Sequence, residues 1–315
     1  MITVAPSAAP PTTAPRVAIL FVVFNRTDVT TRVLDSIRAA RPPRLYVAAD
    51  GPRAGRPAEA EACATVRQQI LDGVDWPCEV HTLFRDENLG CRQAVSGAID
   101  WFFSHEEAGI ILEDDCLPEP SFYTYCEEML HHYRDDTRVM HINGTNYLRG
   151  WHRDPDYSYY FSNYSAIWGW ATWRRAWQHY DVTTRLLPEL EGKHYFWRRF
   201  FNSLEARMLL KPLWATHART LDTWDYQWSF AVLVQSGLCI TPAVNLISNI
   251  GFGGGATHTH NAAHPLAELP VRALAQPFRH PSFVLRDTIS DYRQLRGTLR
   301  DKVVARLRNV APFLA

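Results

Sequence analysis

The sequence feature that most constrains the fold is a repeated alternation of short apolar runs with longer amphipathic stretches in the first third of the chain. Four apolar runs have the length of strands, at 17–24, 44–50, 79–84 and 108–115. The stretches between them space their apolar residues as helices do, at 28–40, 59–71 and 91–103. This alternation is typical of an α/β fold whose strands are parallel and joined by crossover helices. Loops at the carboxyl edge of such a sheet bind ligands.

The chain changes character after about residue 140, because nine of the eleven tryptophans lie between 151 and 228. We expect a disordered leader (1–15), a first half (16–140), a second half of the same domain (141–280) and a basic C-terminal segment (281–315). Residues 286–308 have helical spacing, with seven basic against three acidic residues. We expect a solvated helix there, and the alternative is contact with an anionic membrane surface.

Composition excludes several classes of protein. The 33 basic and 33 acidic side chains balance, which argues against nucleic-acid binding. The longest apolar run has only eight residues (17–24), far fewer than the ~20 that span a bilayer. The six cysteines show no paired spacing, and the first residues lack the features of a secretory signal. We therefore expect free thiols in a cytoplasmic protein.

Three consecutive acidic residues, Glu113, Asp114 and Asp115, end the fourth apolar run. Because side chains of an extended backbone alternate between faces, Glu113 and Asp115 are expected on one face and Asp114 on the other. A divalent cation or a polar ligand would relieve their mutual repulsion, and oxygen ligands favour Mg²⁺ or Mn²⁺ over Zn²⁺. The alternative is a solvated acidic turn that caps a helix beginning near Pro118 and Glu119.

The order of these motifs resembles the nucleotide-sugar-binding half of GT-A glycosyltransferases, in which an acidic DxD motif follows the fourth strand. The Glu-Asp-Asp variant is similar to that of the inverting N-acetylglucosaminyltransferase I type. Residues 169–177 (GWATWRRAW) and 248–260 (SNIGFGGGATHTH) look like bacterial nucleotide-diphospho-sugar transferases, some of which carry haemolytic-protein-like names. The resemblance covers residues 16–260 and rests on motif order. It implies a GT-A (Rossmann-like) mixed sheet flanked by helices, with an aromatic-rich acceptor half.

The resemblance assigns the donor nucleotide to the loops after the first two strands. Phe24, Asn25 and Arg26 would line the nucleotide pocket. Asp50 would accept a hydrogen bond from the base or ribose, and Gly51 would permit a tight turn. The tetrapeptide Ala-Asp-Gly-Pro that contains them also predicts a simple turn without any ligand.

Residues 85–90 (RDENLG) lead into the third predicted helix. Arg85, Asn88 and Arg92 would surround a helix start, which suits a diphosphate. The alternative is that Asn88 and Gly90 form only the turn, while the two arginines lie in solvent.

Within the acidic triplet, the resemblance implies that Asp115 ligates the metal and that Glu113 reaches the ribose or sugar. Asp114 would act through water or a hydroxyl of the donor sugar. The Mn²⁺ or Mg²⁺ ion would bridge both phosphates of the donor, with a UDP-sugar favoured. His258 would be a further metal ligand in a glycine-rich loop that orders when the donor binds, and the alternative is an exposed pair with His260.

Asp225 is the expected general base and Asp222 the second choice. A partly desolvated carboxylate among aromatic residues has a raised pKa, which suits proton abstraction. Either residue could instead cap the helix expected at 227–234.

Tryptophans are the expected acceptor contacts, because aromatic faces pack against sugar rings. The candidates are Trp168, Gly169, Trp170 and Trp224. Trp170, Trp173 and Trp177 are spaced by three and four residues, so a helix would place them on one face. Such a stripe is more often part of a core.

We therefore predict a metal-dependent glycosyltransferase that moves a sugar from a nucleotide-diphosphate donor to a hydroxyl of a glycan or glycolipid, with inversion. It would act in the cytoplasm, and the alternative is peripheral contact of the basic C-terminal segment with the inner face of the membrane. A sugar nucleotidyltransferase is one alternative, but those enzymes carry a glycine-rich basic loop after the first strand, where this chain has FNRTD (24–28). The other alternative is a non-catalytic carbohydrate-binding homologue.

Overall fold

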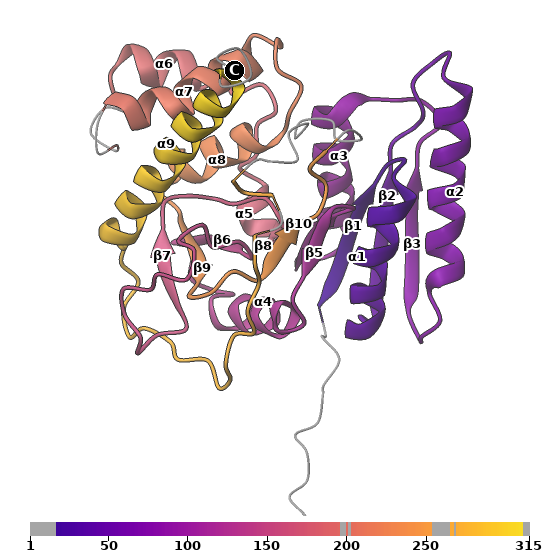
Figure 1. Ribbon diagram of the computed structural model, residues 1–315, viewed down its shortest axis with the longest axis horizontal. Coiled ribbons are helices and arrows are strands. Elements are labelled where there is room, and N and C mark those ends of the chain that lie inside the picture. Colours follow the sequence, from indigo (N-terminus) through magenta and orange to yellow (C-terminus); the bar gives the residue numbers. More distant parts are fainter. Residues whose placement is uncertain (1–16, 196–199, 201–202, 254–264, 268, 311–315) are drawn as a thin grey trace, which may run out of the picture.

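The computed structural model describes residues 17–195, 200, 203–253, 265–267 and 269–310 (Figure 1). Its first part alternates strands and helices as the sequence predicts. The strands are β1 (Ala18–Val23), β2 (Arg44–Ala49), β3 (Glu79–Phe84) and β4 (Ala108–Glu113). The helices between them are α1 (Thr27–Ala40), α2 (Pro57–Gly73) and α3 (Gly90–His105). The predicted α/β class is confirmed.

The main sheet is mixed, with the strand order β3-β2-β1-β4-β8-β6-β9-β7 among the described residues. Strands β1 to β4 are parallel, whereas β8 (Trp170–Trp173) runs antiparallel between β4 and β6 (Val139–Asn143). Strand β9 (Leu238–Pro242) pairs with β6, and β7 (Tyr159–Ser162) pairs with β9. A small ribbon of β5 (Cys116–Pro118) and β10 (Ile247–Asn249) follows the acidic end of β4. The Rossmann-like part is therefore joined to a mixed extension, in which only β6 and β9 pair in parallel among the described residues.

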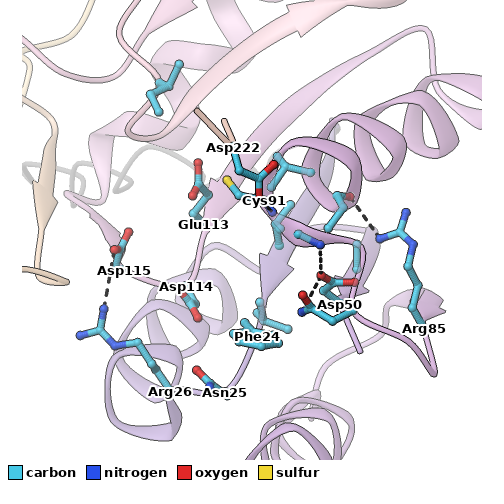
Figure 2. Close-up of a pocket in the computed structure, with 18 of the residues that line it drawn as sticks. Phe24, Asn25, Arg26, Asp50, Arg85, Cys91, Glu113, Asp114, Asp115 and Asp222 are labelled. Atoms are coloured by element: carbon cyan, nitrogen blue, oxygen red, sulfur yellow. Dashed lines mark hydrogen bonds and ion pairs between the residues drawn. The ribbon is translucent and has the colours of Figure 1, made fainter. Parts of the chain in front are cut away.

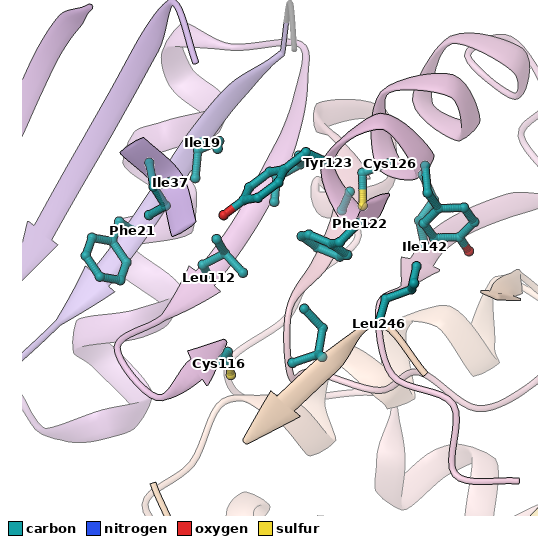
Figure 3. Packing of buried hydrophobic residues seen from close by; sticks show 14 of the residues in the cluster. Ile19, Phe21, Ile37, Leu112, Cys116, Phe122, Tyr123, Cys126, Ile142 and Leu246 are labelled. Carbon is teal, nitrogen blue, oxygen red and sulfur yellow. The ribbon is translucent and has the colours of Figure 1, made fainter. Parts of the chain in front are cut away.

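Alternate residues of the central strands face two separate cores. Ile19 and Phe21 pack under α1, α2 and α4 (Ser121–His132), on the side that Figure 3 shows. Ala18 and Leu20 pack under α3, α5 (Arg174–Trp177) and α8 (Asp225–Val234). A third core joins α6 (Leu187–Gly192) and α7 (Ser203–His217) to α8. Because β1 is buried on both faces, its sequence is a continuous apolar run.

The predicted helical stripe of tryptophans is wrong. Trp170 and Trp173 lie in β8, and only the short helix α5 carries Trp177. Strand β8 pairs with both β4 and β6, so Trp170 and Trp173 point into opposite cores. Sheet pairing on both edges has overridden the helical spacing of the sequence.

The C-terminal helix is confirmed as α9 (Thr288–Val310). Its first turn is anchored on β7, because the buried carboxylate of Asp291 accepts hydrogen bonds from Ser162 Oγ at 2.5 Å and Arg286 Nε at 2.6 Å. No helix in the described part of the chain is both long and apolar enough to cross a membrane. All six cysteines are free thiols, as predicted, and the predicted leader lies outside the described residues.

Candidate functional site

A cavity of about 390 Å³ opens at the carboxyl ends of β1, β2 and β4, beside the start of α3 (Figure 2). Its volume lies within the ~300–1,000 Å³ usual for small-molecule sites. The order of the strands reverses between β1 and β4, and ligands of open α/β sheets bind at such a point. We call it the acidic cavity. Its wall includes eleven predicted site residues: Phe24, Asn25, Arg26, Asp50, Arg85, Asn88, Glu113, Asp114, Asp115, Trp168 and Asp222.

The three acids of the triplet all reach this cavity. Glu113 is the last residue of β4, whereas Asp114 and Asp115 form a turn that leads into β5. The predicted alternation of faces is therefore wrong for Asp114, because the extended backbone ends before it. Figure 2 shows Glu113 toward Cys91 and Asp222, and Asp115 toward Arg26.

Acidic side chains outnumber basic ones on the wall of the acidic cavity. Burial raises the pKa of Glu113 well above its usual range, and the charges of Asp115, Asp114 and Asp225 raise it further. Burial also raises the pKa of Asp114 and of Asp115, against the opposing effect of Arg26. One buried oxygen of Glu113, Oε1, has no hydrogen-bond partner among the described residues. A cation at this edge would stabilise the ionised carboxylates.

Asp115 is packed beneath the chain that follows β10. Asn249 Nδ2 donates to Asp115 Oδ1 at 3.3 Å, and the Ile250 amide donates to the Asp115 carbonyl at 2.8 Å. Arg26 Nη1 lies 3.9 Å from Asp115 Oδ2 and donates to the Gly251 carbonyl at 3.1 Å. A Cβ atom on Gly251 would lie 1.9 Å from Asp115 Oδ2. The close approach of this segment to Asp115 therefore requires glycine at position 251.

The metal prediction concerns Asp115 and His258. His258 lies outside the described residues. Within the described part, no group of three or more His, Cys, Asp or Glu side chains could hold a metal ion. Mg²⁺ commonly takes only one or two protein carboxylates and completes its shell with substrate phosphates and water. The oxygen donors of the triplet fit an ion shared with a phosphate ligand, and they do not form a closed protein site.

Asp50 holds the neighbouring loop. Its two carboxylate oxygens accept hydrogen bonds from the amides of Gly51, Leu89 and Gly90 and from Asn88 Nδ2, at 3.0–3.2 Å. A carboxylate offers about four lone-pair sites, so these donors engage it fully. Asp50 therefore fixes this loop, and the hydrogen bond that it would accept from a base or ribose stays a prediction. Gly51 is packed against the Glu87 backbone, where a Cβ atom would approach to 2.4 Å.

Asp222 reaches from the second half of the chain to the first turn of α3. Its Oδ2 accepts from the Cys91 amide at 2.9 Å and its Oδ1 from the Arg92 amide at 3.2 Å. These amides have no partner within the helix, so Asp222 satisfies donors that a helix start leaves open. The predicted alternative, in which Asp222 caps the helix at 227–234, is wrong, because the helix that Asp222 caps is α3.

The arginines at the start of α3 do not both line the cavity. Arg85 does, and its Nη1 donates to the Ala94 carbonyl at 3.1 Å, while burial lowers its pKa. Arg92 is absent from the wall, and its buried Nε has no hydrogen-bond partner in the described structure.

Asp225 is the first residue of α8 and is not part of the cavity wall. Thr223 Oγ1 donates to its Oδ1. Its charge nevertheless contributes to the raised pKa values of Glu113, Cys91 and Tyr147. The carboxylate therefore lies within electrostatic range of the acidic cavity.

The predicted acceptor residues separate into two groups. Trp170 and Trp224 are 0% and 1% exposed and stack with ring centroids 5.6 Å apart, so neither can touch a ligand. Their predicted role in acceptor binding is wrong, because both belong to the core beneath α3 and α8. Trp168 is half-buried and lines the cavity. Gly169 turns the chain between Trp168 at the cavity and Trp170 in the core. Its φ is +58°, and a Cβ atom at this position would clash with Ile247.

Sequence reasoning missed the aromatic neighbours of Trp168. The ring centroids of Tyr147 and Phe252 lie 5.8 Å and 5.6 Å from that of Trp168, and both contacts are edge-on. It also missed Arg53, whose guanidinium lies 5.9 Å from the centre of the Phe24 ring. These residues are isolated in loops, so no spacing in the sequence signals them.

The chain matches no protein-family model and no curated protein. Among solved structures it is similar to the crystal structure of HddC from Yersinia pseudotuberculosis, with 10% identity and a TM-score of 0.31, over 50% of this chain and 77% of that one. It is also similar to a UDP-glucose pyrophosphorylase complexed with UDP-glucose, with 11% identity and a TM-score of 0.27, over 47% of this chain and 62% of that one. Neither TM-score establishes a shared fold or activity.

Proposed function

We propose that the chain is a GT-A type glycosyltransferase that binds a nucleotide-diphosphate sugar in the acidic cavity and transfers the sugar to a hydroxyl acceptor. One observation carries the proposal: three carboxylates with raised pKa values converge at the end of the central strand β4, in a cavity at the switch point of the sheet. Such a cluster suits a ligand that arrives with a divalent cation.

The nucleotide would lie along the ends of β1 and β2. Phe24 and Arg53, whose guanidinium lies over the Phe24 ring, both line the cavity and would offer an aromatic ring and a planar cation to a nucleobase. Arg26, which already contacts Asp115 and the Gly251 carbonyl, would bind a phosphate oxygen. These contacts orient the diphosphate toward the acidic triplet.

Asp115 would hold the cation, Mn²⁺ or Mg²⁺, and Glu113 would contact the sugar or ribose. When bound, the ion supplies positive charge to the donor phosphates and stabilises the departing diphosphate. The buried Glu113 Oε1 that lacks a partner among the described residues would accept a hydrogen bond from a donor hydroxyl.

Asp225 would remove the proton from the acceptor hydroxyl. The acceptor oxygen then bonds to the anomeric carbon while the bond from that carbon to the diphosphate oxygen breaks, so the configuration inverts and the nucleoside diphosphate leaves. Trp168, with Tyr147 and Phe252 around it, would pack against a sugar ring beside this edge.

Nucleotidyl exchange is the second candidate, because its phosphate-bearing substrates also arrive with a divalent cation, which the carboxylates of the acidic cavity suit. Both reactions begin with a nucleotide sugar in the same cavity. The loop between β1 and α1 weighs against exchange, since it has only Phe24, Asn25 and Arg26 and no glycine.

The test is to incubate the protein with UDP- and GDP-sugars and Mn²⁺, once with a panel of glycan and glycolipid acceptors and once with pyrophosphate. The proposal predicts release of nucleoside diphosphate with formation of a glycosylated product, and loss of that product in Asp225→Asn. Nucleoside triphosphate formed only with pyrophosphate would instead establish the exchange reaction. Saccharide binding without turnover of any donor would establish the carbohydrate-binding alternative.

A further inference from the structure

A second cavity of about 790 Å³ lies between α7, the segment 220–221, α8 and α9. We call it the α7 groove. Figure 1 shows α7, α8 and α9 gathered on the side of the molecule away from α2 and β3. Its apolar wall comes mainly from α7, which contributes Met208, Pro212 and Ala215, and α9 contributes Leu299.

Two cations of α7 line the same groove. Arg207 and Lys211 are exposed and lie four residues apart, so they share one face of the helix. Like charges at this spacing destabilise a helix. No acidic residue lines the groove, and within the described structure neither cation has a hydrogen-bond or ion-pair partner. The groove therefore presents two positive charges without a counter-ion.

The combination of these cations with apolar walls defines the chemistry of an occupant. A small inorganic anion would leave the Met208, Pro212 and Leu299 side of the groove in contact with water. A neutral apolar molecule would leave Arg207 and Lys211 unpaired. A molecule with an alkyl chain and an anionic head satisfies both, and a phosphomonoester carries a charge of about −1.5 to −2 at neutral pH, which matches two cations better than a carboxylate does.

We propose that the α7 groove binds an amphipathic phosphomonoester, with the phosphate on Arg207 and Lys211 and the alkyl chain against the apolar wall. The hydroxyl of Tyr226 lies in the same wall and can donate a further hydrogen bond to the phosphate, whereas Thr220 Oγ1 already donates to the Ala215 carbonyl at 3.1 Å. This site does not depend on the activity proposed for the acidic cavity.

The two cavities share one segment of the chain. Thr220, Leu221 and Tyr226 line the α7 groove, while Asp222 between them lines the acidic cavity and holds the start of α3. The segment 220–226 therefore borders both cavities.

The test is calorimetric titration of the full chain with decyl phosphate below its micelle concentration at pH 8. We expect saturable binding of one molecule per chain. The double variant Arg207→Glu/Lys211→Glu should weaken it by at least about tenfold, because each exposed cation is replaced by a charge that repels the phosphate. Binding should also weaken at pH 5, where the phosphomonoester carries a single charge.

The matched control is Arg41→Glu/Arg134→Glu, which makes the same change in net charge at exposed cations outside both cavities. It should leave the affinity for decyl phosphate unchanged. Inorganic phosphate should bind far more weakly than decyl phosphate, because it buries no alkyl chain. The proposal is overturned if decyl phosphate does not saturate, if the control weakens binding as much as the double variant, or if decyltrimethylammonium binds equally well. Since all these readouts are binding, failure of the proposed glycosyl transfer leaves them intact.

Discussion

The parallel half of the sheet and its aromatic extension use their most conspicuous residues in opposite ways. In the parallel half, the charged residues at the ends of β1, β2 and β4 converge on one cavity. In the extension, the tryptophans that the structure describes mostly fill the core, and among them only Trp168 lines that cavity. Parallel strands buried on both faces leave chemistry to their end loops, whereas a strand rich in tryptophan contributes packing. Position at a strand end therefore predicts which side chains reach the cavity better than residue type does.

The largest expected effect separates two tryptophans that are two residues apart. Trp170→Ala removes a fully buried ring that packs against Trp224, Trp228 and His141, so it should lower the free energy of unfolding by about 3–5 kcal/mol. Trp168→Ala removes a half-buried ring at the cavity, so the loss should be less than half as large. Urea unfolding of both variants measures the difference.

Trp170→Phe is the conservative control, because it keeps an aromatic ring in the core and should recover part of the lost stability. Equal losses for Trp168→Ala and Trp170→Ala would break the distinction between cavity wall and core.

The next effect concerns His141, which is fixed as a neutral ring within the aromatic extension. Trp228 Nε1 donates to its Nδ1 at 3.0 Å, so its Nε2 carries the proton and donates to the Ala166 carbonyl at 3.0 Å. Burial lowers the pKa of His141 to about 4. Between pH 6.5 and 4 the unfolded chain binds a proton that the folded chain does not, so stability should fall as the pH is lowered, by up to about 3 kcal/mol.

Urea midpoints measured from pH 7.5 to 4.5 test this pH dependence. His141→Gln keeps one donor and one acceptor without a titrating group, so its stability should fall less steeply over that range. The same slope in His141→Gln as in the original chain would show that other groups cause the loss.

The smallest effect tests the link between the two halves. Asp222→Ala removes the acceptor for the Cys91 and Arg92 amides at the start of α3, which should cost about 1 kcal/mol of stability. Asp222→Asn retains a side-chain acceptor and should cost less. Hydrogen exchange at the two amides should accelerate more in the alanine variant. Abolished glycosyl transfer in Asp222→Asn, with both amides still protected, would make Asp222 the base in place of Asp225.

The secondary structure of the parallel half could be predicted from the sequence better than that of the aromatic extension. Residues 17–113 could be divided correctly into strands and helices, because each apolar run and each helical stretch has its own local signal. The engagement of Asp50 by the 88–90 loop could not be predicted, since its donors lie about forty positions away. The helix predicted from the spacing of Trp170 and Trp173 was wrong for a related reason. The segment forms a strand because it pairs with β4 and β6, which are distant in the sequence.

The candidate site was predicted in position better than in detail. The acids of the triplet and the loop after β1 reach one cavity because strand ends of a parallel sheet share an edge. The grouping of Tyr147, Trp168 and Phe252 depends on three separate loops meeting in space, and no local pattern carries that information.

The measurement that tests the central claim most directly is calorimetric binding of UDP and GDP, with and without Mn²⁺, to the original chain and to Asp115→Ala. Asp115→Asn, which preserves shape, serves as the second variant, and urea unfolding confirms that each variant folds. We predict that one nucleotide binds only with Mn²⁺ and that both folded variants lose this binding. Binding of equal strength without metal, or unchanged metal-dependent binding in a folded Asp115→Ala protein, would contradict the role of the acidic edge as a metal-assisted diphosphate site.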